Sequence, residues 1–226
     1  MNPEFWLENW KNNKIGFHQQ EINTYLATFW QQLDVIPNGR VFVPLCGKSL
    51  DLIWLCQQGH EVLGVELSDL AVNQLFSENG ISYNKVMQDG FQLYQTESLT
   101  ILQGDFFNLT ADYLHDVQGV FDRASLVALP IELRQKYASQ LSSILPDMAK
   151  ILLVTFEYEQ SAMQGPPFSV SEAEVQALYR ESYEINRLCA QDALDNYPQF
   201  RSAGLTCLQE KVYLLKSHKH PEQQSG

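Results

Sequence analysis

The chain has 226 residues, 45% of them hydrophobic, which suits one large domain with a sizeable core. Its formal net charge of −12 would repel phosphate groups, so we expect no nucleic-acid partner. The most apolar run, Ile151 to Phe156, is too short to span a membrane and no leader pattern opens the chain, so we expect a cytoplasmic protein without a membrane partner.

An aromatic segment opens the chain. Trp6, Trp10 and Phe17 precede an amphipathic stretch that contains Tyr25 and Trp30. The segment, residues 1–35, is too short for a separate domain, and we expect it to be helical. Its spacing alone is typical of a hydrophobic stripe that packs a helix on a sheet.

From residue 40 onward, strand-like runs alternate with helical runs, which is typical of a parallel sheet covered on both faces. We predict strands at 40–43, 60–67, 99–102, 117–122 and 151–158, and helices at 49–59, 69–79, 131–145 and after Ser171. Two closing strands, 183–188 and 205–215, are compatible with an antiparallel hairpin. The pattern predicts a single α/β domain over residues 1–216, with a doubly wound, mostly parallel Rossmann-like sheet and an antiparallel C-terminal strand. A disordered tail, 217–226, is expected to follow.

The first predicted strand runs into a helix through the turn Pro44 to Ser49, where open α/β sheets bring backbone amides to a cofactor. A phosphate-binding loop would need glycine in place of Phe42, and a dinucleotide turn would need three glycines where this turn has one. The residues present favour the nucleotide turn of a methyltransferase, whose ligand has no pyrophosphate.

Acidic side chains stand at the ends of the next two predicted strands. Glu66 comes 19 residues after Gly47, close to the spacing at which a carboxylate accepts hydrogen bonds from ribose hydroxyls. A solvated carboxylate is equally typical of that position alone, and the preceding turn favours ribose binding. Gly104 and Asp105 end the next strand, where an adenine would lie if Glu66 fixes the ribose. A Gly-Asp turn of local origin is at least as typical there.

Asp122 and Arg123 end the fourth predicted strand, and side chains at that end of such a sheet point into the ligand crevice. Arg123 is therefore a candidate for the reacting part of the site. The alternative is an exposed ion pair with Asp122 or another carboxylate, which would stabilise the fold little.

The four cysteines lack the spacing of a metal site or a disulfide framework, so we expect reduced thiols and no metal. His218 and His220 in the tail could bind a metal adventitiously, but the composition there favours solvated side chains. Cys46 lies in the turn, where a helix N-terminus could activate it as a nucleophile.

Short motifs along the chain form a distinctive set: Trp6, Trp10, Phe17-His18, Val43 to Lys48, Gly59-His60, Gly64 to Glu66, Asp122-Arg123, Gly165 to Phe168 and Tyr213 to Leu215. In this order, over nearly the whole chain, they resemble the thiopurine S-methyltransferase family, in its bacterial form. The Pro-Leu-Cys-Gly-Lys turn is the most specific of them.

The resemblance implies an enzyme that uses S-adenosyl-L-methionine, contacted by residues matching Trp10, Leu45, Glu66 and Arg123. It also implies an N-terminal lid over the cofactor, with Trp6 and Phe17 close to the ligand. An aromatic face against the cationic sulfonium is favourable. Methyl transfer to a small-molecule thiol is an in-line displacement that needs no enzyme nucleophile, so Cys46 is not expected to react. We expect Arg123 to orient the acceptor or favour its anionic form.

The acceptor itself stays open. Animal members of the family carry a further arginine near the substrate, and within residues 192–204 Arg201 does not clearly match it. Bacterial relatives have been associated with selenium and tellurium compounds, so metalloid detoxification is an alternative role. A nicotinamide-dependent oxidoreductase and a silent adenosine-binding module are others. A monomer is the simpler expectation.

Overall fold

The computed structural model describes residues 3–218. Within that range, nine strands form one sheet in the order β3-β4-β5-β2-β1-β6-β7-β9-β8. The strands are β1 (Arg40–Val43), β2 (Glu61–Glu66), β3 (Asn84–Gln88), β4 (Phe91–Gln95), β5 (Leu99–Gln103), β6 (Val117–Arg123), β7 (Lys150–Glu157), β8 (Tyr183–Asp192) and β9 (Gln209–Ser217). The helices are α1 (Pro3–Lys11), α2 (Thr24–Phe29), α3 (Leu50–Gln57), α4 (Asp69–Glu78), α5 (Ile131–Ile144), α6 (Glu172–Tyr179) and α7 (Pro198–Ser202).

The centre of the sheet is parallel, from β5 through β2, β1 and β6 to β7. Both margins are antiparallel, with β3 and β4 beside β5, and β9 and β8 beside β7. The predicted doubly wound α/β sheet is therefore confirmed, and the predicted C-terminal antiparallel strand is one arm of the β8–β9 hairpin.

The β3–β4 hairpin is a difference from the predicted fold. Every residue of β3 is exposed, so it has no apolar periodicity to reveal it. A signal was present in Asp89-Gly90, because both residues adopt positive φ and this dipeptide favours tight hairpin turns.

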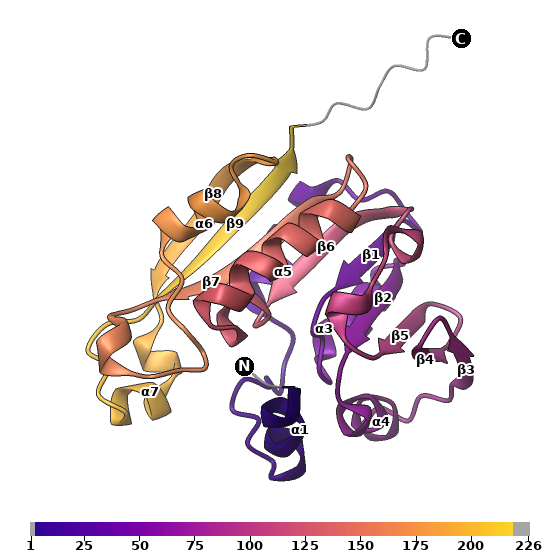
Figure 1. Cartoon of the computed structure of the whole chain (residues 1–226), viewed down its shortest axis with the longest axis horizontal. Helices are drawn as coiled ribbons and strands as arrows, with labels where there is room; N and C mark the ends of the chain where they lie inside the picture. The colour runs from indigo at the N-terminus through magenta and orange to yellow at the C-terminus, as the bar shows by residue number, and fades with distance from the viewer. Residues whose placement is uncertain (1–2, 219–226) are drawn as a thin grey trace.

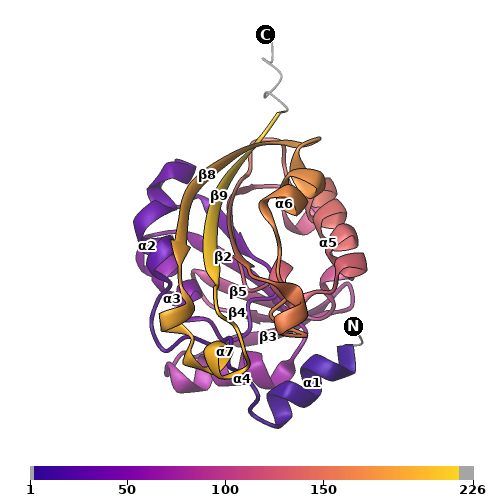
Figure 2. The ribbon, with the colours of Figure 1, turned by 90° about the vertical axis from the view of Figure 1, so that its left-hand side faces the viewer.

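Helices cover both faces of the sheet (Figures 1 and 2). Side chains of β1 alternate: Val41 and Val43 pack in the cluster with α2, α3 and α4, whereas Phe42 packs in the cluster with α5 and α6. Ser49, Ser68 and Ser171 cap the N-termini of α3, α4 and α6 by accepting backbone N–H bonds.

The aromatic opening segment divides between two places. Tyr25 and Leu26 of α2 are buried on a face of the sheet, as an amphipathic helix requires. Helix α1 instead lies at one end of the molecule, the same end as α4 and α7 in both views (Figures 1 and 2). That end is where the parallel strands finish, so α1 is placed to cover their carboxyl ends.

Ser217 is the last residue of β9, and the His218 backbone N–H donates to the Ser182 carbonyl at 2.9 Å. Regular structure thus reaches the first residue of the expected tail. The rest of that tail, including His220, lies outside the described residues. No helix within residues 3–218 is both long and apolar enough to cross a membrane.

Candidate functional site

A cavity of about 490 Å³ opens at the carboxyl ends of the parallel strands. This volume is typical of small-molecule sites. Its walls come from α1 and the loop after it, from the turns that follow β1, β2, β5 and β6, and from the segment around α7. The site lies where the strand order reverses between β1 and β6, the usual ligand position in open α/β sheets.

The turn after β1 is held by its neighbour β2. The Cys46 N–H donates to the Val65 carbonyl at 3.0 Å, and the Gly47 N–H donates to Glu66 Oε2 at 2.8 Å. Leu45 has a φ of 43° and Gly47 one of 53°. A positive φ at a leucine is strained and persists only where surrounding contacts enforce it, as they do at binding sites. The predicted nucleotide turn is thus a rigid loop whose Leu45 lines the cavity.

Glu66 lies at the end of β2, lines the cavity and is only 7% exposed. Its second carboxylate oxygen, Oε1, accepts the Ser68 N–H at 2.7 Å. Burial raises the pKa of Glu66, and the backbone N–H bonds from Ser68 and Gly47 oppose that rise. The Leu67 N–H also acts on this carboxylate, and two oxygens with about four acceptor positions can still accept hydroxyl groups from a ligand.

Asp105 and Gly104 have separate places. Asp105 lines the cavity, and its Oδ1 accepts the Phe107 N–H at 2.9 Å, which caps a short 3-10 turn. Gly104 does not line the cavity. A Cβ added there would lie 2.6 Å from Cδ1 of Phe91, so glycine is required for close packing against β4. The structure brings Asp105 into the site and places Gly104 behind it.

Three aromatic side chains of the opening segment, Trp6, Trp10 and Phe17, line the cavity together. Phe17 packs edge-on against both tryptophans, with ring centroids 5.7 Å apart in each case. Trp10 is 4% exposed and lies over the turn, since a Cβ on Gly47 would be 3.2 Å from its Cζ2 atom. These three side chains therefore pack on the turn and around its cavity. The packing on a sheet face that the spacing alone indicated is wrong for α1.

Arg123 ends β6 and faces the cavity, and Ala124 after it has a φ of 63°. Asp122 points away from the cavity, where its Oδ2 accepts the Tyr137 hydroxyl at 2.7 Å and burial raises its pKa to about 6. Alternation along the strand separates the two side chains, so the alternative of an Asp122–Arg123 ion pair is wrong. Across residues 3–218 no carboxylate forms an ion pair with Arg123.

Beyond Arg123 the wall is aromatic and comes from residues that the sequence reasoning missed. Tyr197 packs edge-on against Phe156 of β7 at 5.3 Å and stacks on Phe200 of α7 at 5.2 Å. All three line the cavity. Arg201, in contrast, is exposed and pairs with Asp195. The signal available was the Tyr197-Pro198 start of a short helix, with Phe200 three residues after Tyr197 on the same side.

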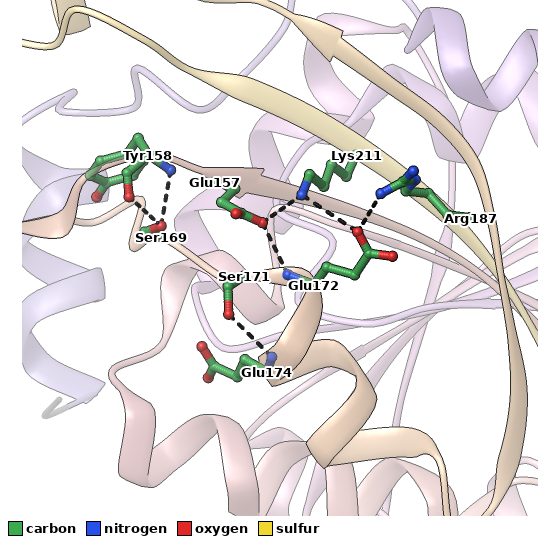
Figure 3. A network of polar contacts seen from close by, with 8 residues as sticks. All are labelled: Glu157, Tyr158, Ser169, Ser171, Glu172, Glu174, Arg187 and Lys211. Carbon is green, nitrogen blue, oxygen red and sulfur yellow. Dashed lines mark hydrogen bonds and ion pairs between the residues drawn. The ribbon is translucent and has the colours of Figure 1, made fainter.

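Pro166 and Pro167 add a further part of the wall. The Tyr158 hydroxyl donates to the Pro167 carbonyl at 2.5 Å, and the Tyr158 N–H donates to Ser169 Oγ at 3.0 Å. Figure 3 shows Tyr158 and Ser169 beside an ionic network that joins β7, α6, β8 and β9. The network consists of Lys211, Glu157, Glu172 and Arg187, with Lys211 Nζ 2.7 Å from Glu157 Oε2.

Cys46 is fully buried, and burial raises the pKa of its thiol well above the ordinary value. A thiol kept protonated is a poor nucleophile, so the site offers no activated cysteine here. Residues 3–218 contain no group of three histidine, cysteine or acidic side chains arranged to hold a metal ion.

The cavity has two unlike halves. One half lies at the ends of β5, β2 and β1, and we call it the cofactor half for the role proposed below; the other, which we call the acceptor half, lies at the ends of β6 and β7 with the α7 segment. Lys48 at the first half is neutralised by Glu78, with Nζ 2.7 Å from Oε1. Arg123 brings an unpaired guanidinium to the second. An arrangement of this kind can hold a nucleoside on one side and present an anion-binding group on the other.

Comparisons with known proteins identify the family of this chain. A family model described as thiopurine S-methyltransferase matches residues 1–218. A thiopurine S-methyltransferase from Nitrosospira multiformis is 51% identical over 215 residues, covering 95% of this chain and 98% of that protein. One from Shewanella oneidensis is 45% identical over 216 residues, covering 96% and 99%.

Solved structures share the fold at low sequence identity. A SAM-dependent methyltransferase from Anabaena variabilis matches with a TM-score of 0.66 at 12% identity, over 96% of each chain. The 1,6-didemethyltoxoflavin-N1-methyltransferase of Burkholderia thailandensis, solved with S-adenosylhomocysteine and 1,6-didemethyltoxoflavin, matches with a TM-score of 0.62 at 15% identity, over 95% of this chain and 87% of that one.

Proposed function

Because the chain belongs to the thiopurine S-methyltransferase family, we propose that it transfers a methyl group from S-adenosyl-L-methionine to the sulfur of small aromatic thiols, thiopurines among them. The observation that carries the choice of acceptor is Arg123 beside the aromatic wall, with no carboxylate partner within residues 3–218. A planar ring can stack on that wall while its thiolate meets the guanidinium.

The cofactor half fits S-adenosyl-L-methionine. Glu66 retains acceptor lone pairs for ribose hydroxyls, and Leu45 and Asp105 line the cavity on either side of it. We assign Trp10 to the cover of this half because its ring already lies over Gly47. The Gly104 N–H donates to the Glu66 carbonyl at 2.9 Å. We therefore propose that the main chain at Gly104 supports the adenine side of the site through Glu66.

Catalysis rests on placement and charge. The cofactor supplies a methyl group on a positively charged sulfur. Arg123 attracts the acceptor as its thiolate and stabilises that charge, while Trp6 and Phe17 exclude water from the reacting sulfur. Holding sulfur and methyl group in line then accelerates the displacement without a covalent enzyme intermediate.

Alternative roles have less support. The family match and its relatives give no support to a nicotinamide-dependent oxidoreductase. Nothing in the cavity singles out selenium or tellurium compounds over thiols. We also propose a cytoplasmic monomer that binds no nucleic acid. Four unpaired cysteines support a reducing compartment, and the net charge of −12 supports the absence of a nucleic-acid partner.

The test is a methylation assay with a panel of aryl thiols, thiopurines and selenols. Arg123→Ala should lower kcat/KM for aryl thiols by about 10- to 100-fold, because one charge-assisted contact to the acceptor is lost. Arg201→Ala is the matched control, since it removes an exposed arginine outside the cavity. An unchanged kcat/KM for aryl thiols in Arg123→Ala would contradict the proposal.

A further inference from the structure

Glu210 on β9 is a buried carboxylate, 5% exposed, that is held by two tyrosines. The Tyr25 hydroxyl of α2 donates to Oε2 at 2.9 Å, and the Tyr197 hydroxyl donates to Oε1 at 2.7 Å. These residues come from both ends of the chain. The two bonds differ in one respect: Tyr197 lines the cavity, and Tyr25 does not.

Three contacts hold the Tyr197 side chain in place. Its ring packs on Phe156 and Phe200, and its hydroxyl proton is committed to Glu210. Burial and the Glu210 charge raise the pKa of Tyr197, while the neighbouring Arg123 guanidinium opposes the rise. A hydroxyl that already donates can offer a ligand or neighbour only its lone pairs. Arg123 of β6 pairs with Val154 of β7, two residues before the Phe156 on which Tyr197 packs. Both Arg123 and Tyr197 line the cavity, so the donor placed to use these lone pairs is the Arg123 guanidinium.

Within residues 3–218, Arg123 and Arg180 form no ion pair with a carboxylate, and of the two only Arg123 lines the cavity. Direct carboxylate partners are found for Arg40, Arg134, Arg187 and Arg201. An acidic partner of that kind would orient Arg123 but cancel its charge. A neutral tyrosine oxygen orients it without cancelling the charge, and the carboxylate behind the tyrosine makes that oxygen a stronger acceptor.

We propose that Glu210 and Tyr197 form a positioning pair that orients the Arg123 guanidinium toward the acceptor sulfur and leaves its positive charge available. This inference rests on the proposed function and adds two positioning residues to it. Glu210 acts through Tyr197, and Tyr197 acts through Arg123.

Other titratable groups also face the cavity: Lys14 and His18 after α1, Lys48 and Asp51 around the start of α3, and Glu66 and Asp105 at the cofactor half. Burial, then the charge of Lys48, lowers the pKa of His18. None of these residues changes in the variants below, so a difference between those variants reports on Tyr197 and Glu210.

The experiment measures the pKa of thiophenol bound to the complex with S-adenosylhomocysteine, from the ultraviolet difference spectrum of the thiolate. No turnover is required. Tyr197→Phe should raise the bound thiol's pKa by about one unit, a tenfold loss of thiolate at a given pH, because the guanidinium is no longer held at the sulfur. Glu210→Gln should shift the pKa in the same direction by less.

Tyr25→Phe is the matched control. It removes a tyrosine hydroxyl bond to Glu210, as Tyr197→Phe does, but from a tyrosine that lies outside the cavity. The pKa of the bound thiol should therefore stay at the wild-type value. Circular dichroism melts verify folding, and Glu210→Gln serves as the test if Tyr197→Phe does not fold. An unchanged pKa in both variants, or an equal shift in Tyr25→Phe, would overturn the positioning pair.

Separate outcomes concern the proposed function. If the wild-type protein binds thiophenol but does not methylate it, the proposed function fails while the pKa comparison still stands. If the wild-type protein does not bind thiophenol at all, both are overturned.

Discussion

The two halves of the cavity are built by different means. In the cofactor half, main-chain groups of adjacent turns bond one another through Glu66, which joins the turn after β1 to the turn after β2. In the acceptor half, side chains from separate parts of the sequence meet, as where the Tyr197 ring packs against Phe156 of β7 at 5.3 Å. A main-chain site keeps its shape when its side chains change, whereas a wall of side chains changes with each substitution. The structure thus allows one cofactor site to be combined with different acceptor sites.

The largest expected effect breaks the cofactor half. Glu66→Ala leaves the Gly47 and Ser68 N–H groups without their acceptor and removes the ribose contact, so affinity for S-adenosylhomocysteine should fall by about 100-fold or more. Isothermal titration calorimetry measures it. Glu66→Gln keeps one acceptor oxygen and should lose less, and equal affinity in Glu66→Ala and wild type would refute the assignment.

A second prediction concerns Asp122, which lies beside Arg123 at the end of β6 and supports the acceptor half, and the dependence of stability on pH. The Asp122 pKa is raised to about 6 in the folded protein from an ordinary value of 3.8. Its contribution to stability is therefore fully present below the unfolded pKa and is lost as pH rises through 6. The side chain of Asp122→Asn cannot ionise. Between pH 4 and pH 7, the free energy of unfolding of this variant should therefore rise by about 2 kcal/mol relative to that of the wild type, as measured by unfolding at each pH. A pH-independent difference would show that Asp122 titrates normally.

Gly104→Ala separates packing from binding within the cofactor half. The added methyl group meets the Phe91 ring at 2.6 Å, so the free energy of unfolding should fall by about 1 to 2 kcal/mol. Affinity for S-adenosylhomocysteine should stay within about twofold, because Gly104 lies behind the cavity. Chemical denaturation and calorimetry give the two numbers, and a large loss of affinity with unchanged stability would contradict the placement of Gly104.

The smallest expected effect concerns the cover. Trp10→Phe keeps an aromatic ring over Gly47 but removes part of its area, so cofactor affinity should fall by about fivefold. Thiol KM should change little, since Trp10 covers the other half. Steady-state kinetics with both substrates varied separates the effect on the cofactor from the effect on the thiol. A rise confined to the thiol KM would assign Trp10 to the acceptor side.

The difference between the halves also explains what the sequence could predict. Leu45, Glu66, Asp105 and Arg123 each follow a predicted strand, and strand ends converge at one edge of a parallel sheet, so local patterns were sufficient to bring them together. Tyr197 and Phe200 follow no such rule. Their position depends on the β8–β9 hairpin folding back beside β7, which is a long-range event that residues 192–204 do not encode locally.

Two further features were not predicted from the apolar patterns of the sequence. The edge strand β3 is exposed throughout and carries no apolar alternation. The spacing of Trp6 and Trp10 indicated a helix but could not tell whether it packs on a face of the sheet or across its end. That choice depends on the Trp10 ring fitting over Gly47, where no side chain stands in its way.

The cover of the cavity is also synthesised long before its far wall. Helix α1 ends at Lys11, whereas Tyr197 and Glu210 leave the ribosome almost 200 residues later. The emerging chain therefore carries a tryptophan-rich helix whose docking surface is still being made. A full cavity exists only after the β8–β9 hairpin closes, so ligand binding can stabilise finished molecules and gives no help to truncated ones.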